Sequence, residues 1–150
     1  MNTFLIATDG SPAAEAAVEA GVQLAEEQGA AVVFLHVVEA LDVVAPLFGP
    51  ILATPVQLGT AEDDAALSHA AEVARTHDVA YELKLVSGFD ADTILATADA
   101  VDAELIAVGS NRHGVLGTMY LGSVSKELLR RARRPLLVVH PTPVALTARV

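Results

Sequence analysis

Short apolar runs alternate along the chain with longer stretches in which apolar residues recur at every third or fourth position. The runs have the length and the Val, Ile and Leu content of strands, and they cover residues 4–8, 31–38, 80–86, 104–109 and 135–139. The helical spacing predicts helices over about 12–28, 60–77, 91–101 and 122–132. Strands that alternate with helices pair in parallel through right-handed crossovers. The pattern therefore predicts an α/β fold with a single doubly wound five-stranded parallel sheet and helices on both faces.

Local signals mark the first helix most clearly. Ser11 is suited to cap its amino end, and Pro12 occupies the first helical position, where a missing N–H costs nothing. Gly29 is a typical stop. Open parallel sheets bind ligands at the carboxyl ends of strands, where the strand order reverses. If the strands at 4–8 and 104–109 are neighbours at that point, the carboxyl ends of 4–8, 31–38 and 104–109 converge.

Residues 40–58 interrupt the alternation. The segment from 39 to 59 carries three prolines and two glycines, yet it is rich in Val, Leu, Ile and Phe. Long connections of this kind are functional loops, partner surfaces or disordered segments, and the apolar content favours a flexible apolar flap or interface segment. We expect one domain over 1–150, with a C-terminal extension over 141–150.

Composition excludes several classes of function. The chain of 150 residues has a net charge of −10 and no cysteine, so it lacks disulfides and thiolate metal sites. The acidic surface disfavours nucleic acid and anionic membranes as partners. No apolar run approaches the roughly 18 residues of a membrane helix, and the N-terminus is typical of a strand rather than a signal peptide. We expect a cytoplasmic protein.

A glycine-rich segment separates the fourth strand from the last helix, with glycines at 109, 114, 117 and 122. The amino end of a helix attracts phosphate, and glycine lets the backbone approach a ligand closely. Ser123 and Ser125 add hydroxyl groups in the first helical turn. The same residues also fit a loose connector followed by a capped helix, so both interpretations stay open.

Familiar catalytic and nucleotide signatures are missing. Residues 109–114 match the start of a P-loop, but Val115 and Leu116 stand where Lys and Ser or Thr are required. The sequence has no dinucleotide fingerprint and no nucleophile elbow. No general base, nucleophile pair or metal cluster stands out. A binding protein is therefore favoured over an efficient catalyst, and a small hydrolase or transferase is the weakest of the alternatives.

Several stretches together resemble the universal stress protein family: "LIATDGS", "LHVVE", "VSG" and "ELIAVGS…LGSVSKELL…RRPLLVV". The resemblance covers nearly the whole chain in the right order and spacing. It implies the strand order 3-2-1-4-5, a homodimer through residues 135–139 and a role in surviving stress. An uncharged edge strand at 135–139 is consistent with such pairing.

Some members of this family bind ATP through the motif G-x-x-G-x9-G-[ST]. Gly109, Gly122 and Ser123 match it, whereas Arg112 stands in place of the second glycine and Gly114 follows two residues later. The resemblance implies ATP, with or without Mg²⁺, as the cofactor. The implied site places the nucleoside and the phosphates against the residues Ala7, Thr8, Asp9, Val37, Val108, Gly109, Ser110, Arg112, Gly114, Gly122, Ser123, Val124 and Ser125.

Arg112 leaves two functions open. A guanidinium beside phosphate is a favourable partner, and the chain is then a nucleotide-binding stress-response switch or sensor. If the backbone at this position needs a positive φ, arginine costs on the order of 1 kcal/mol there and its side chain blocks the phosphates. The chain is then a universal stress protein without ATP that acts as a dimeric interaction protein.

Other polar residues have structural and functional interpretations. Asp9 either ties the turn after the first strand or accepts hydrogen bonds from a nucleoside, and its place at a strand end favours the second role. His36 is expected to be a satisfied, buried histidine. His69 and His77 lack a third metal ligand. The basic residues between Lys126 and Arg134 are expected to serve the end of the last helix rather than nucleic acid.

Overall fold

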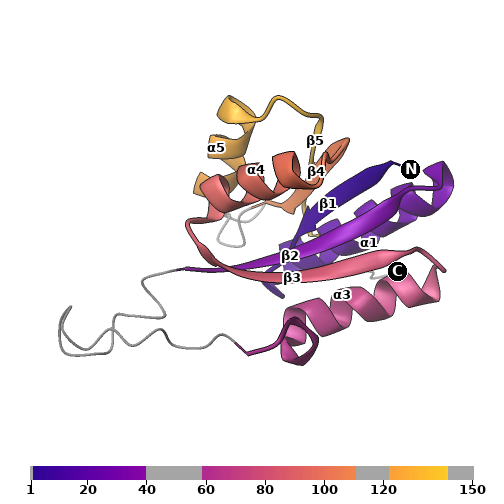
Figure 1. Ribbon diagram of the computed structural model, residues 1–150. Coiled ribbons are helices and arrows are strands. Elements are labelled where there is room, and N and C mark those ends of the chain that lie inside the picture. Colours follow the sequence, from indigo (N-terminus) through magenta and orange to yellow (C-terminus); the bar gives the residue numbers. More distant parts are fainter. Residues whose placement is uncertain (1, 40–58, 111–121, 142–150) are drawn as a thin grey trace, which may run out of the picture.

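The computed structural model describes residues 2–39, 59–110 and 122–141, and within them a five-stranded parallel sheet flanked by helices (Figure 1). The strands follow the order β3-β2-β1-β4-β5, as predicted. Their bounds are β1 Thr3–Ala7, β2 Ala31–Glu39, β3 Tyr81–Gly88, β4 Leu105–Gly109 and β5 Leu136–Val139. The helices are α1 Pro12–Gln28, α3 Ala65–Thr76, α4 Asp90–Ala100 and α5 Ser123–Arg131, with a 3₁₀ turn, η2, over Ala61–Asp63.

The central strand β1 pairs with β2 on one side and with β4 on the other. Ala7 lies opposite Leu35 of β2, and Ile6 lies opposite Ala107 of β4. The chain thus builds one half of the sheet, returns through α4 and builds the other half. The reversal of strand order at β1 creates the position where open α/β sheets bind ligands.

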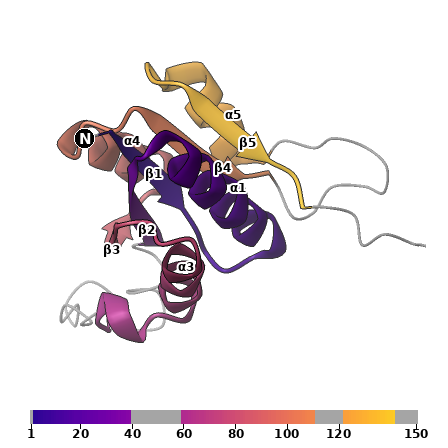
Figure 2. The same ribbon diagram turned by 90° about the vertical axis from the view of Figure 1, so that its right-hand side faces the viewer.

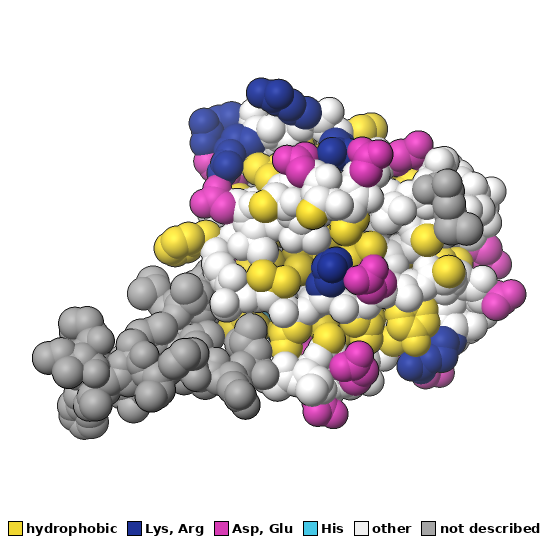
Figure 3. Space-filling model, viewed as in Figure 1, with side chains coloured by type: hydrophobic (Ala, Val, Ile, Leu, Met, Phe, Trp, Pro, Cys, Tyr) yellow, Lys and Arg dark blue, Asp and Glu magenta, His cyan; other side chains and the backbone are white. Residues whose placement is uncertain are grey.

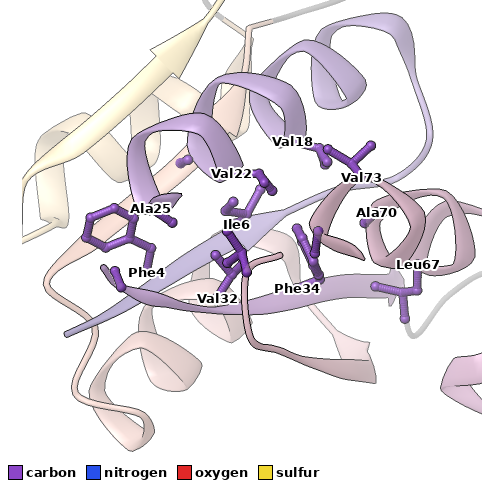
Figure 4. Close-up of a cluster of buried hydrophobic side chains, with 14 residues drawn as sticks. Phe4, Ile6, Val18, Val22, Ala25, Val32, Phe34, Leu67, Ala70 and Val73 are labelled. Carbon is purple, nitrogen blue, oxygen red and sulfur yellow. The ribbon is translucent and has the colours of Figure 1, made fainter. Parts of the chain in front are cut away.

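Two apolar clusters cover the two faces of the sheet. Alternating strand residues such as Phe4, Ile6 and Phe34 pack against α1 and α3, as Figure 4 shows for the cluster that contains them. Leu5 and Leu35 point the other way and pack against α4 and α5. Figure 2 shows α1 and α4 on opposite sides of the strands. The helices on both faces confirm the predicted double winding, and they fix the strand ends that carry the site.

The predicted helix over 60–77 is divided in two. The 3₁₀ turn η2 ends at Asp63, and α3 begins after Asp64, whose carboxylate accepts a hydrogen bond from the Leu67 N–H at 3.0 Å. An aspartate in extended conformation satisfies the first amides of a helix better than a continued helical turn does. The start of this predicted helix was therefore wrong by about one turn.

The two edges of the sheet differ in charge. The edge strand β3 carries Glu82 and Lys84, whose charged groups lie 3.3 Å apart. The other edge strand, β5, has the sequence LLVV, and its residues are partly buried. Charged side chains on an edge discourage pairing with another chain, so only β5 presents an uncharged edge.

Basic residues gather over α5 and its carboxyl end (Figure 3). Arg131 binds Asp92 of α4 at 2.7 Å, and Arg134 binds Asp99 and Asp102. The hydrogen bond that Arg134 donates to Asp99 raises the pKa of Arg134 above its ordinary value. These contacts support the predicted structural use of the cluster.

Some of the predicted features lie outside the described residues: the segment 40–58, Arg112, Gly114 and almost all of the extension 141–150. Of the helices that the structure describes, none is both long and apolar enough to cross a membrane. Within the same ranges, no three His, Asp or Glu side chains gather in the way that a metal ion requires.

Candidate functional site

A pocket of about 390 Å³ lies at the carboxyl ends of β1, β2 and β4. Every described residue of the predicted nucleotide site lines it: Ala7, Thr8, Asp9, Val37, Val108, Gly109, Ser110, Gly122, Ser123, Val124 and Ser125. The pocket has the size of a small-molecule site. Segments far apart in the sequence therefore meet where the strand order predicts a ligand.

The pocket also contains residues that were not predicted to belong to it: Ser11, Ala14, Leu35, His36, Asp90 and Ile94. Ser11 and Asp90 lie at helix starts that follow the carboxyl ends of strands, which is the signal that could have included them. Leu35 and Ile94 are buried core residues. Their place in the wall follows from packing between distant elements.

The loop after β1 is held by its own side chains. Thr8 donates its backbone N–H to the Leu35 carbonyl at 2.8 Å, and its hydroxyl accepts from the Gly10 N–H at 3.2 Å. Asp9 Oδ1 accepts from the Ser11 N–H at 2.9 Å, and Gly10 has a φ of 81°. Asp9 therefore ties the turn, which was the structural alternative. A bond from Asp9 to a nucleoside stays a prediction.

Gly109 makes the closest approach in the site. A Cβ at this position would lie 2.4 Å from the carbonyl carbon of Ala13 and 2.6 Å from the nitrogen of Ala14. The end of β4 thus rests directly on the first turn of α1. The Ser125 hydroxyl donates to the Gly109 carbonyl at 3.1 Å and brings the first turn of α5 to the same point. The hydroxyl of Ser125 is therefore already engaged within the chain.

Three helices present their amino ends near the pocket, and they differ in how those ends are satisfied. Ser11 caps α1 by accepting from the Ala14 N–H at 3.3 Å. The first turn of α4 carries Asp90 and Asp92, whose charges offset the positive end of the helix dipole. At α5, Gly122 makes no side-chain cap and the first turn has no acidic residue. The amino end of α5 is therefore the one best able to attract an anion.

The hydroxyl group of Ser110 is a second feature of the pocket that favours a polar ligand. Only 6% of this residue is exposed, and its hydroxyl oxygen has no hydrogen-bond partner among the residues that the structure describes. A buried polar atom without a partner costs about 1–3 kcal/mol. Ser110 follows β4 directly and lines the pocket beside the amino end of α5. A ligand oxygen at this position would satisfy the hydroxyl.

His36 is satisfied within the chain, as predicted, but it is only partly buried, with 20% of its side chain exposed. Its Nδ1 lies 2.8 Å from Oδ2 of Asp64, the residue that also caps α3. Because this bond occupies Nδ1, the ring reaches any further polar group through Nε2. His36 also lines the pocket. The pair joins the end of β2 to the start of α3 and fixes one wall of the site.

This arrangement defines a class: an open α/β domain with a pocket at the reversal of its strand order. The model of the universal stress protein family matches residues 1–140. The chain belongs to this family, as its sequence motifs indicated.

Individual relatives agree with the family assignment. A universal stress protein of Bacillus subtilis, YxiE, is 32% identical over 145 residues, which cover 92% of this chain and 98% of the relative. A universal stress protein of Mycolicibacterium smegmatis is 28% identical over 142 residues, or 91% of this chain. The chain spans about half of that second relative's length, 47%.

Solved structures share the fold. One is a universal stress protein in complex with cAMP, which is 25% identical to this chain. The superposition covers 94% of this chain and 98% of that protein with a TM-score of 0.69.

Proposed function

We propose that this chain binds an adenine nucleotide in the pocket and acts as a stress-response switch or sensor rather than as an efficient catalyst. The observation that carries the proposal is the uncapped amino end of α5, which faces the same pocket as the unpartnered hydroxyl of Ser110. A relative of the same fold was solved with cAMP. The working compartment in this proposal is the cytoplasm.

The proposed ligand lies across the carboxyl end of the sheet. Its nucleoside contacts Ala7, Thr8, Asp9 and Val37, and its ribose and first phosphate pass Val108, Gly109 and Ser110. Its terminal phosphates accept hydrogen bonds from the amides that open α5, from Gly122 to Ser125. Amides at a helix start bind phosphate because they have no partner inside the helix and lie at the positive end of its dipole.

ATP with Mg²⁺ is the specific ligand that we propose. Mg²⁺ in nucleotide sites is held largely by phosphate oxygens and water, so the pocket needs few protein ligands for it. Arg112 and Gly114 complete the predicted site. We propose that they lie near the phosphates because they stand between Gly109 and Gly122 in the sequence.

The first test asks what the protein carries. We expect that protein purified under gentle conditions releases an adenine nucleotide on denaturation, identified by mass spectrometry. Nucleotide-free protein should then bind ATP with Mg²⁺ in calorimetric titrations. If no adenine nucleotide is released and the titrations stay flat up to millimolar ATP, the alternative of an interaction protein without ATP replaces the proposal.

We also propose a homodimer through β5. The Ser110 N–H donates to the Val139 carbonyl and the Ile106 N–H donates to the Pro135 carbonyl, both at the inner edge of β5. Polar groups of successive residues alternate between the two edges of a strand, so those of Leu136 and Val138 face away from β4. They are suited to pair with a second copy.

The dimer is tested by removing one outward donor. Val138→Pro deletes an N–H that β4 does not use, and proline is tolerated in edge strands. Light scattering should give twice the chain mass of 15.5 kDa for the unaltered protein and a single chain mass for the variant. Circular dichroism checks that the variant is folded. A single chain mass for the unaltered protein would contradict the dimer.

A further inference from the structure

The arginines around the carboxyl end of α5 form two groups. Arg131 and Arg134 bind aspartates of α4 and of the turn after it, and they join the end of α5 to that neighbouring helix. Arg130 pairs instead with Glu127 of its own helix. Among the residues that the structure describes, Arg133 has no hydrogen-bond or ion-pair partner. The second group, Arg130 and Arg133, is therefore not needed to hold elements together.

Both members of this second group are exposed. The side chain of Arg130 is 70% exposed, and its contacts with Glu127 use Nη2 alone. A guanidinium has five N–H donors, and an exposed ion pair within one helix is weak. Arg133 lies in the bend that follows α5 and is also exposed. Each side chain therefore has donors with which it can bind a carboxylate from outside the chain.

An exposed leucine accompanies these arginines. Leu129 is 51% exposed, and within the described ranges only Phe89 is a comparably exposed large apolar side chain. A single exposed leucine is ordinary on a protein surface, but this one directly precedes Arg130. Arginine is enriched in protein interfaces, where its planar head binds carboxylates and its stem covers apolar surface. We call Leu129, Arg130 and Arg133 together the Leu129 patch.

The charge around the Leu129 patch contrasts with that of the whole chain. The net charge is −10, yet five of the nine basic residues lie in the segment 126–134. Figure 3 shows the dark blue side chains gathered over α5. A long nucleic acid or an anionic membrane would extend past this small basic region and meet the acidic remainder, which repels it. The patch also has no aromatic side chain on which a base could stack. A short acidic segment fits the charge distribution better.

We infer that the Leu129 patch docks an acidic protein segment that carries an apolar side chain among its carboxylates. The carboxylates of the partner bind the guanidinium groups of Arg130 and Arg133, and its apolar side chain covers Leu129. The inference goes beyond the proposed nucleotide site and does not depend on it. Since Ser125 in the first turn of α5 binds the end of β4 beside the pocket, one helix carries the proposed ligand site at its start and this surface at its end.

The test uses short synthetic peptides, each with one leucine among glutamates at different spacings. Fluorescence anisotropy of labelled peptides measures their binding to the full chain at low salt. We expect binding by acidic peptides, and a fall in affinity as salt screens the charges. Matched peptides with glutamine in place of every glutamate should not bind.

The variants locate the surface. The double variant Arg130→Gln and Arg133→Gln should weaken the best acidic peptide about ten-fold, since two exposed ion pairs together contribute about that much. Leu129→Ala should weaken it about three-fold by removing apolar contact. The double variant Arg75→Gln and Lys84→Gln is the matched control, because it removes two charges from exposed ion pairs away from α5. It should stay within about two-fold of the wild type, and circular dichroism checks that all variants are folded.

Four results would overturn the inference. One is that the wild type binds none of the acidic peptides, and another is an equal loss in the two double variants, which would assign binding to general charge. The third is tighter binding of oligothymidylate or of phosphatidylserine vesicles than of any peptide. The fourth is a mass in light scattering that falls to a single chain only when Arg130 and Arg133 are replaced, which would assign the patch to a second copy. If the peptides bind as expected while ATP titrations stay flat, the inference stands and the nucleotide site fails.

Discussion

The amino ends of α1 and α5 meet the same pocket but are built from different residues. α1 begins with Ser11 as a side-chain cap and Pro12 in the first helical position. α5 begins with Gly122, which makes no side-chain cap, and Ser123 in the first position. One helix start is therefore capped by its own side chain, whereas the N-cap residue of the other supplies no side-chain acceptor.

The difference separates anchoring from binding. The first turn of α1 is a fixed surface on which the end of β4 rests, with Gly109 in direct contact with Ala13. The first turn of α5 is joined to β4 through the Ser125 hydroxyl, and its remaining amides are the donors in the proposed site. A rigid neighbour thus holds the binding helix in place.

The largest expected effect on stability comes from forcing the end of β4 away from the first turn of α1. Gly109→Ala places a methyl group within 2.6 Å of backbone atoms in Ala13 and Ala14. Overpacking of this kind costs about 1–3 kcal/mol, and contact with backbone favours the upper end. We expect the free energy of unfolding to fall by about 3 kcal/mol in chemical denaturation, with loss of nucleotide binding.

Gly59→Ala is the matched control for that substitution. A Cβ at Gly59 meets nothing within 4 Å, so its stability should stay within about 0.5 kcal/mol of the wild type. Equal losses in the two variants would show that the contact at Gly109 is not the cause.

The most direct test of this difference is to cap the amino end of α5 in the way that α1 is capped. The double substitution Gly122→Ser and Ser123→Pro supplies a cap and deletes the first amide, and the extended backbone of Gly122, with ψ of 169°, suits a residue before proline. Helix stability should be retained, because proline is tolerated at this position. We expect ATP to bind about ten-fold more weakly in calorimetry, or by about 1.4 kcal/mol.

Ser123→Ala is the control, since it removes the hydroxyl and keeps the amide. Its affinity for ATP should stay within about two-fold of the wild type if the amides carry the binding. A loss as large as that of the double variant would assign the contact to the hydroxyl instead.

Removing the side-chain cap of α1 tests whether this helix start only supports the site. Ser11→Ala removes the cap of α1, in which the hydroxyl accepts from the Ala14 N–H at 3.3 Å. Loss of such a cap costs about 1 kcal/mol, and thermal unfolding should show it as a lower midpoint. ATP affinity should change less than in the α5 double variant, and a larger change would mean that α1 also binds the ligand.

The smallest effect is expected at the far end of α5. Arg131→Gln breaks the ion pair with Asp92 that joins α5 to α4. Both side chains are partly exposed, at 39% and 62%, so the loss in unfolding free energy should be about 0.5 kcal/mol or less. Chemical denaturation at low and high salt should show the difference shrinking as salt screens the pair.

Much of the fold could be predicted because its signals are local. The apolar runs gave all five strands to within about two residues, and Ser11, Pro12 and Gly29 marked α1 correctly. The strand order came from the family resemblance rather than from the runs themselves. The start of α3 was missed because Asp64 caps it after a separate turn.

The wall of the pocket was harder to predict because it depends on contacts between distant segments. Asp90 reads in sequence as an ordinary acidic residue at a helix start, and only the placement of α4 over the sheet brings it into the site. The bond between His36 and Asp64 joins residues 28 positions apart. Gly109 lines the pocket, and its close packing on the backbone of α1 is a second role that the sequence did not indicate.

The unequal charge of the two outer strands limits how copies of this chain can assemble. β3 carries a paired glutamate and lysine, and β5 carries only aliphatic residues. Open-ended growth of a continuous sheet needs two edge strands per molecule that can pair with another copy, and this protein has a single such edge strand, β5. Association by strand addition would therefore close after two molecules and leave no template for fibre growth.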